Sequence, residues 1–223
     1  MDGPVIIDVI LGAPLLGWRT SWQGGRAKLE LRPVPGAATG LRGLIVALDP
    51  GHPPLGTLGP TGLAEDSLTL AVAIEAAKRL RALGARPVLT RQDARPVSLE
   101  ARLARAEEAG AQLFVSIHAN APGEGRPPWS VEGTRVFWFQ PQARSLAKAL
   151  EVSVAAALHR DDSGIIHSDL AVTRATWFPA VLVEGTGLTV PAREAYLRSP
   201  GGIADYAAGV VAGIQGWLAA RAE

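Results

Sequence analysis

The 223-residue sequence contains no cysteine. This excludes disulfide bonds, a cysteine nucleophile and a cysteine-ligated zinc site, and it leaves the redox compartment open. A dominant charge is missing too, since 22 Lys and Arg residues stand against 21 Asp and Glu residues, for a net charge of +1. Nucleic-acid-binding proteins ordinarily carry a basic patch or stripe, so this balance argues against a nucleic-acid partner.

Long apolar runs are also missing. A membrane-spanning helix needs about 20 consecutive apolar residues, and we find no such run, so we expect no transmembrane segment. Residues 1–4 lack the basic region of a secretory signal. Apolar residues nevertheless make up 48% of the chain, which is ample for a core. The length exceeds the common domain size of about 100 to 150 residues, which predicts one catalytic domain with something attached.

Histidines follow two of the predicted strands. The apolar run of residues 44–48 stops at Asp49-Pro50-Gly51 and is followed at once by His52. Residues 113–120 repeat the design, with His118 near the carboxyl end. Buried runs of this kind are typical of central strands in α/β sheets, which bind ligands beyond the carboxyl ends of their strands. Both histidines therefore lie where a site is expected.

Glu65 stands at the entrance of a predicted helix that Gly84 closes. Considered alone, a carboxylate at this position is explained equally well as a favourable partner for the positive end of the helix dipole. Together with His52 and His118 it completes a His/Glu/His set, which leaves a tetrahedral zinc ion one position for water, as in hydrolytic sites. The three residues are far apart along the chain and match no compact metal motif, so their spacing alone is a weak indication.

Short motifs in order along residues 43–220 are more specific. They are LDPGH (48–52), GLAE (62–65) with LTL (68–70), LTR (89–91), SL (98–99) with Arg102, FVSIHAN (114–120) and PAVLVE (179–184). This set resembles the zinc-dependent N-acetylmuramoyl-L-alanine amidases of bacterial cell-wall metabolism, the amidase type 3 family. The resemblance implies that His52, Glu65 and His118 are zinc ligands and that Glu184 is the catalytic carboxylate. It further implies hydrolysis of the amide bond between N-acetylmuramic acid and L-alanine.

The local sequence pattern supports a site role for Glu184 independently of the resemblance, because Glu184 directly follows the short apolar strand pattern of residues 180–183. Asn120 follows His118 by two residues on the same strand face, and we expect it to orient a ligand or the substrate. His159 and His167 are weaker candidates for substrate contact. Arg91 and Arg102 are interpreted as structural ion-pair partners rather than as substrate-binding residues.

Three departures from the family pattern concern the surroundings of the site. Pro53-Pro54 replaces the glycines that usually follow the first histidine, which predicts a stiffer loop. Residues 185–190 replace the usual aromatic and asparagine after the catalytic carboxylate, so substrate contacts are expected to differ. Residues 121–132 are too rich in Pro and Gly for the inhibitory helix of some relatives. We therefore expect activity without an activator.

The alternation of strands and helices predicts an α/β fold, namely a three-layer αβα domain with a twisted, mostly parallel sheet. This zinc amidase domain is assigned to residues 43–221. Residues 1–40 are interpreted as a β-rich extension and linker, the remnant of an amino-terminal targeting domain. We expect a strand at 5–11, a hairpin of 17–22 and 27–32, and a linker at 33–40. Trp18 and Trp22 share a strand face and are expected to pack on the catalytic domain.

The implied substrate predicts an extracytoplasmic location, in the cell envelope, in the periplasm or secreted, and a chain trimmed from a longer precursor. The expected cofactor is Zn²⁺, the expected partners are peptidoglycan or muropeptides, and the expected state is a monomer. Two alternatives stay open. A zinc exopeptidase has similar architecture but lacks the ordered motifs, and a non-catalytic peptidoglycan-binding relative has no need to keep all four site residues.

Overall fold

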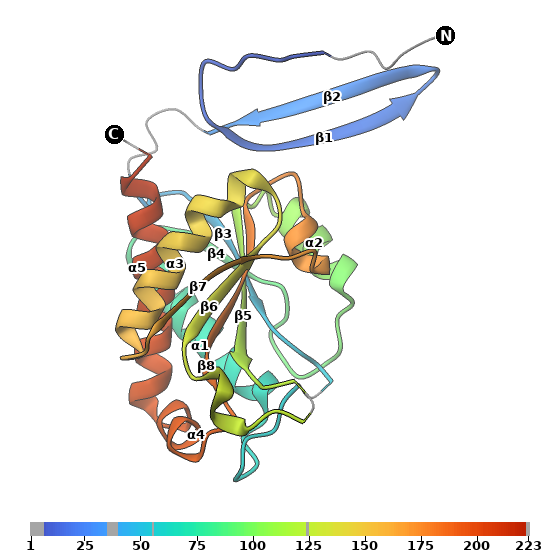
Figure 1. The fold of residues 1–223 in the computed structure, drawn as a ribbon. Coiled ribbons are helices and arrows are strands. Elements are labelled where there is room, and N and C mark those ends of the chain that lie inside the picture. The colour runs from blue at the N-terminus through green and yellow to red at the C-terminus, as the bar shows by residue number, and fades with distance from the viewer. Residues whose placement is uncertain (1–6, 35–39, 55, 124, 222–223) are drawn as a thin grey trace.

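The computed structural model describes residues 7–34, 40–54, 56–123 and 125–221. It confirms the α/β class with a six-stranded sheet in the order β4-β3-β5-β8-β6-β7 (Figure 1). The strands are β3 (Ile45–Pro50), β4 (Arg86–Leu89), β5 (Leu113–Asn120), β6 (Thr134–Trp138), β7 (Asp162–His167) and β8 (Ala180–Gly187). Strands β4, β3, β5 and β8 run parallel, whereas β6 is antiparallel to β8 and parallel to β7.

Helices cover both faces of the sheet unequally (Figure 1). One face carries α1 (Glu65–Ala82), α3 (Arg144–Ala157) and α5 (Pro200–Ala219), with α4 (Pro191–Arg198) leading into α5. The other face carries α2 (Leu99–Glu108) and the short 3₁₀ turn η3 (Ala171–Arg174). Two further 3₁₀ turns are η1 (Pro128–Val131) and η2 (Pro141–Ala143). The thinner cover leaves room for polar side chains on the α2 face.

Strand β5 shows how the sequence divides its side chains between the two faces. Leu113, Val115 and Ile117 belong to the larger core under α1, α3 and α5, whereas Phe114 packs in the smaller core beside α2. Because side chains alternate along a strand, His118 lies on the same face as Phe114. The smaller core therefore ends where the polar site begins.

The predicted amino-terminal hairpin is confirmed as β1 (Leu15–Gln23) paired antiparallel with β2 (Arg26–Pro33). The strand expected at 5–11 is wrong over residues 7–11, which form no strand; residues 1–6, and residues 35–39 of the expected linker, lie outside the described residues. An apolar run with no neighbouring strand to pair with gains no ladder of hydrogen bonds.

The hairpin contacts the main body near its chain entry and exit. The Trp18 amide donates to the Thr176 carbonyl at 2.7 Å, and the Arg32 guanidinium donates to the Ala111 carbonyl at 2.7 Å. The expected packing of Trp22 on the body is wrong, because Trp22 is 74% exposed. It lies one residue before the end of β1, and this turn end of the hairpin extends past the body (Figure 1).

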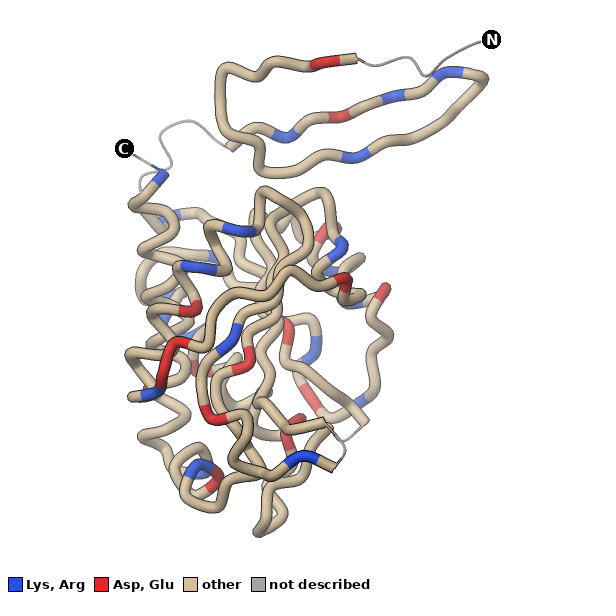
Figure 2. The backbone as a smooth tube through the Cα atoms, in the orientation of Figure 1, with Lys and Arg blue, Asp and Glu red and all other residues tan. Residues whose placement is uncertain are grey.

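Charges of both signs are interspersed along the described chain (Figure 2), which matches the net charge of +1. None of the helices within the described residues combines the length and the apolar character that crossing a membrane requires.

Candidate metal centre

His52 leaves β3 through a tight turn. Its φ of 47° lies in the left-handed region, which non-glycine residues adopt uncommonly. The preceding Gly51 amide donates to the Ile117 carbonyl of β5 at 2.9 Å. A Cβ on Gly51 would lie 2.4 Å from the His118 ring, so the absent side chain lets the two histidines approach. The turn thus brings the end of β3 against the end of β5.

Glu65 is the first residue of α1 and is 2% exposed. Its Oε1 accepts the Ala119 amide at 3.0 Å, and its Oε2 accepts the Thr57 amide at 2.9 Å. Burial opposes the charged form, but the hydrogen bond with His118 and these two amides outweigh it and lower the pKa of Glu65. The helix entrance therefore holds an ionised carboxylate.

The three predicted ligands meet at one point. Each of His52, Glu65 and His118 offers one ligand atom, and these atoms all lie within 4.8 Å of one another. His118 Nδ1 is 3.2 Å from Glu65 Oε1, and His52 Nε2 is 3.5 Å from the same oxygen. Two imidazole nitrogens and one carboxylate oxygen form a donor set that suits a zinc ion with an open position. The side chains as they stand fit such an ion.

Glu184 lies beside this cluster on β8. Its Cα is the register partner of His118 on the neighbouring parallel strand, so the two side chains project from the same face. Among the residues that the structure describes, no group donates a hydrogen bond to the buried Glu184 Oε2. Burial raises the pKa of Glu184 to about 7. This carboxyl group is able to bind and release a proton near neutral pH.

A buried polar network supports the turn that carries His52. Asp49 forms an ion pair of 2.9 Å with Arg102, as predicted for this arginine, and accepts hydroxyl hydrogen bonds from Ser116 and Thr90. Arg102 Nη1 also donates to the Pro50 carbonyl at 2.8 Å. Sequence reasoning gave Asp49 no role, although a charged residue closing an apolar strand was the available signal.

Arg91 supports the same turn in a different way from the predicted ion pair. Its Nε donates to the Pro50 carbonyl at 2.8 Å, and its Nη2 donates to the carbonyls of Gly51 at 2.8 Å and Asp66 at 2.6 Å. It is 2% exposed. One side chain therefore ties the His52 turn to the first turn of α1, where Glu65 begins.

Tyr206 on α5 is a supporting residue that the sequence did not reveal. Its hydroxyl donates to the His118 carbonyl at 2.7 Å and lies 3.2 Å from the Val183 carbonyl. A Cβ on Gly185 would come within 2.5 Å of its ring. This contact explains why a glycine follows Glu184 here, since a side chain at that position would displace the tyrosine that holds both strands.

A cavity of about 390 Å³ adjoins the predicted ligands on the α2 face. It is lined by His52 and His118 and by a mainly apolar wall that includes Pro53, Val97 and Leu170. Pro54 is exposed, and residue 55 lies outside the described residues. The stiffer loop expected from Pro53-Pro54 stays a prediction.

The loop after β5 agrees with the sequence analysis. Across residues 121–123 and 125–132 the chain forms the short 3₁₀ turn η1 and no α-helix. The expectation that no helix of the inhibitory kind occupies this loop is confirmed over these residues.

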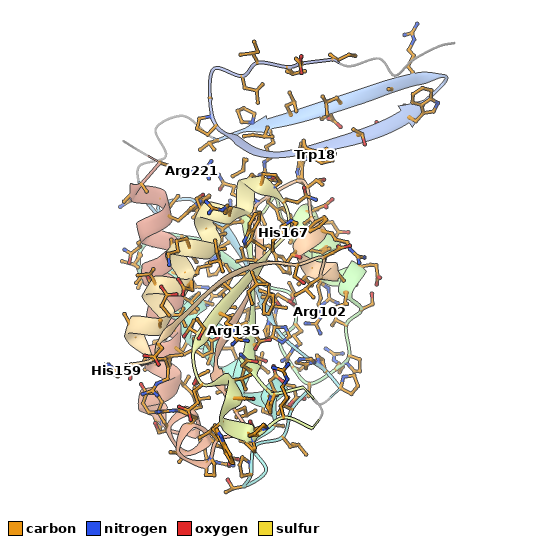
Figure 3. The ribbon with its side chains drawn as sticks, in the orientation of Figure 1. Trp18, Arg102, Arg135, His159, His167 and Arg221 are labelled. Atoms are coloured by element: carbon orange, nitrogen blue, oxygen red, sulfur yellow. The ribbon has the colours of Figure 1, made fainter. Side chains whose placement is uncertain are left out.

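The weaker histidine candidates, His159 and His167 (both labelled in Figure 3), do not belong to the cluster of His52, Glu65 and His118. His167 on β7 pairs with Trp138, which itself pairs with Val181, three residues before Glu184 on β8. Its Nε2 lies 3.1 Å from the Phe139 carbonyl, and its ring stacks on Phe139. The structure does not bring His167 to the metal ligands.

His159 lies at the edge of the molecule, just past the end of α3 (Figure 3). Asn120 ends β5 in register with Gly187, beyond a shift in register after His118. Its side-chain role stays a prediction.

Comparison with known proteins identifies the family. The family model described as N-acetylmuramoyl-L-alanine amidase (Amidase_3) matches residues 46–216. The chain is 34% identical over 174 residues to the uncharacterized protein YqiI of Bacillus subtilis (strain 168), covering 75% of this chain and 81% of YqiI. It is also 34% identical over 149 residues to the N-acetylmuramoyl-L-alanine amidase LytC of the same strain, covering 66% of this chain but 30% of LytC.

Solved structures agree with the sequence relatives. The catalytic domain of CwlV, an N-acetylmuramoyl-L-alanine amidase from Bacillus (Paenibacillus) polymyxa var. colistinus, superposes with a TM-score of 0.73 at 30% identity. The match covers 79% of this chain and 98% of that domain. The amidase AmiC2 of Nostoc punctiforme gives the same TM-score and identity over 79% of this chain. The chain therefore belongs to the Amidase_3 family of N-acetylmuramoyl-L-alanine amidases.

Proposed function

We propose that this chain hydrolyses the amide bond between N-acetylmuramic acid and L-alanine in peptidoglycan, with a zinc ion held by His52, Glu65 and His118. The observation that carries the proposal is the convergence of three ligand atoms within 4.8 Å, with Glu184 in register beside His118. The family match and the amidases among its relatives support the substrate.

The residues divide the work of amide hydrolysis. A bound zinc ion supplies Lewis acidity, which polarises a carbonyl and acidifies water. Glu184 takes the proton from the attacking water and passes it to the departing amine. Its Oε2 has no hydrogen-bond partner within the described part of the chain, and a pKa of about 7 suits a group that both accepts and returns a proton. The Asp49 and Arg91 contacts hold the His52 turn in place during the reaction.

Digestion of purified peptidoglycan by the zinc-loaded protein tests the proposal. We expect new L-alanine amino termini and unlinked glycan strands by mass spectrometry, loss of both with a chelator, and recovery when zinc is restored. Release of single terminal amino acids would instead support the exopeptidase alternative. Binding without products, insensitive to chelator, would support the non-catalytic alternative.

Substitution of the proposed base sharpens this test. Glu184→Gln should lower turnover about 10²- to 10⁴-fold, the usual contribution of a general base, while zinc content stays at the wild-type level. Glu108→Gln is a matched control, because Glu108 is an exposed glutamate at the end of α2. Near-normal activity of Glu184→Gln would overturn the role given to Glu184.

The proposed substrate leads to further proposals about the whole protein. We propose that it acts outside the cytoplasm, as a monomer, and without an activator protein, since residues 121–123 and 125–132 form no α-helix that could cover the site. We also propose that residues 1–40 form a unit appended to the amidase domain of residues 43–221. Finding activity only after addition of a second protein would refute independence from an activator.

A further inference from the structure

Arg135 stands next to the proposed catalytic carboxylate in a row of polar side chains across the sheet. The Cα of Arg135 on β6 is the register partner of Glu184 on β8, and Glu184 is in turn the partner of His118 on β5. Residues directly opposite one another on paired strands project from the same face. His118, Glu184 and Arg135 therefore follow one another on the α2 face of the sheet.

The Arg135 guanidinium is available for a ligand. It is partly buried, and within residues 7–34, 40–54, 56–123 and 125–221 its side chain takes part in no hydrogen bond or ion pair. Its charge acts on Glu184, where it opposes the larger effect of burial on the pKa of that carboxyl group. Figure 3 shows Arg135 over the middle strands of the sheet, between the labelled Arg102 and His159.

The chemistry of the reaction determines which half of the substrate lies near Arg135. The leaving amine must receive its proton from Glu184, so the amine side of the scissile bond lies against that carboxylate. Across β8 from His118, the next strand is β6. The peptide that begins with the leaving amine therefore extends over β6 and Arg135, away from the metal ligands.

The distances suit a carboxylate one residue beyond L-alanine. An extended chain advances about 3.5 Å per residue, which places the α-carboxylate of the second residue about 7 Å from the scissile nitrogen. Neighbouring strands are about 4.8 Å apart, and the long arginine side chain covers the remainder. A guanidinium matches a carboxylate through two parallel hydrogen bonds, a geometry that a carboxamide cannot reproduce.

We propose that Arg135 binds the free α-carboxylate of the residue that follows L-alanine in the stem peptide and so makes the enzyme prefer stems in which this group is free over stems in which it is amidated. This specificity rests on the amidase function proposed above. It adds a carboxylate-binding subsite on β6 to the metal ligands and Glu184.

Two muramyl dipeptides test the proposal, both with the γ-carboxyl group of the second residue blocked as a methylamide. One carries D-glutamate with a free α-carboxylate, and the other carries D-isoglutamine, in which the α-carboxylate is an amide. We expect the zinc-loaded wild type to favour the carboxylate substrate by about three- to tenfold in kcat/KM, the range of a partly exposed charged pair. Arg135→Gln should abolish the preference by slowing the carboxylate substrate alone, and Arg135→Lys should keep part of it. Arg126→Gln, which removes an exposed arginine of the loop after β5, should retain the full preference.

Binding to the metal-free protein gives an independent readout. Titration with the same two dipeptides, followed by NMR, should show tighter binding of the carboxylate form in the wild type and equal binding in Arg135→Gln. Equal cleavage and equal binding by the wild type would overturn the subsite and leave the amidase function standing. A uniform slowing of both substrates in Arg135→Gln would also overturn it, because Arg135 would then act through Glu184.

The proposed function fails in a different way. If neither dipeptide nor peptidoglycan were cleaved, the amidase proposal would be refuted, and with it the preference in cleavage. Tighter binding of the carboxylate dipeptide that Arg135→Gln abolishes would then still support the carboxylate-binding role of Arg135.

Discussion

Replacing Arg102 with methionine tests whether a buried ion pair holds the turn that carries His52. Arg102 and Asp49 have side chains 3% and 1% exposed and lie 2.9 Å apart. The same guanidinium nitrogen donates to the Pro50 carbonyl, two residues before His52. Methionine keeps the aliphatic part of the side chain, so the variant removes the charge and the donors rather than the packing.

The expected loss of stability follows from the buried Asp49 charge, which the substitution leaves without its partner. Removing one partner of a buried ion pair costs about 3 to 5 kcal/mol, because the other charge stays buried without compensation. Asp49 keeps hydroxyl donors from Ser116 and Thr90, so we expect the lower end, about 3 kcal/mol. At about 2 to 4 °C per kcal/mol for a chain of this size, Tm should fall by about 6 to 12 °C.

Thermal unfolding of the metal-free protein, followed by circular dichroism, measures this loss. Arg95→Met is the matched control, because Arg95 pairs with Asp93 at 2.7 Å but is 87% exposed, and exposed pairs contribute at most about 1 kcal/mol. The double variant Asp49→Asn/Arg102→Met should regain part of the stability, since it removes both charges. A fall in Tm for Arg102→Met no larger than that for Arg95→Met would refute the reasoning.

Three further predictions concern acid stability, the glycine at the site and the metal. Burial alone would raise the pKa of Glu194, but two amides of the loop before α1 and an arginine lower it from 4.5 to about 2. The stabilisation by ionised Glu194 is therefore present above pH 4.5 and lost as the pH falls towards about 2. Tm should drop more steeply over this range in the wild type than in Glu194→Gln. Parallel curves of Tm against pH for the two proteins would contradict this. Gly51→Ala, whose Cβ would lie 2.4 Å from the His118 ring, should weaken zinc binding at least about tenfold in a chelator competition assay. Gly123→Ala is the control, because an added Cβ there would meet no atom of the described residues within 4 Å, and it should bind zinc normally. Equal zinc affinities of the two variants would argue against the close approach of Gly51 to His118. Zinc at 100 times its Kd should raise the free energy of unfolding by about 2.7 kcal/mol, an increase that His52→Ala should remove; a metal-independent Tm in the wild type would count against the site.

Local patterns predicted much of the fold. Apolar runs located β3 and β5, and the helix predicted to enter at Glu65 does begin there. The hairpin of β1 and β2 was also predicted from alternation around a glycine turn. The run at 5–11 shows the limit of this reasoning, because residues 7–11 have the composition of a strand but form none. Composition does not supply the neighbouring strand on which a ladder of hydrogen bonds depends.

The supporting residues show a second limit. Asp49 at the end of β3 accepts a hydrogen bond from Ser116 of β5, Arg91 donates to the Gly51 carbonyl, and Tyr206 donates to the His118 carbonyl. Residues from three separate segments thus support the strand ends that carry the predicted ligands. Arg91 was predicted only as an ion-pair partner, and Asp49 and Tyr206 were given no role, because these residue types are compatible with many surroundings. The direction of β6 was equally undetermined, because an apolar strand pattern reads the same in either direction.

The sequence by itself determined the chemistry that is possible here. The chain has no cysteine, two of its four histidines lie at the ends of apolar strands, one carboxylate stands at a helix entrance and another at a strand end. These features are local, since strand alternation and helix entry depend on neighbouring residues. Only the tertiary structure decided that Glu184 stands in register with His118, and Arg135 with Glu184. The apolar pattern of a strand decides which of its faces is buried, but its partner strand and their relative direction depend on packing among segments far apart in the chain.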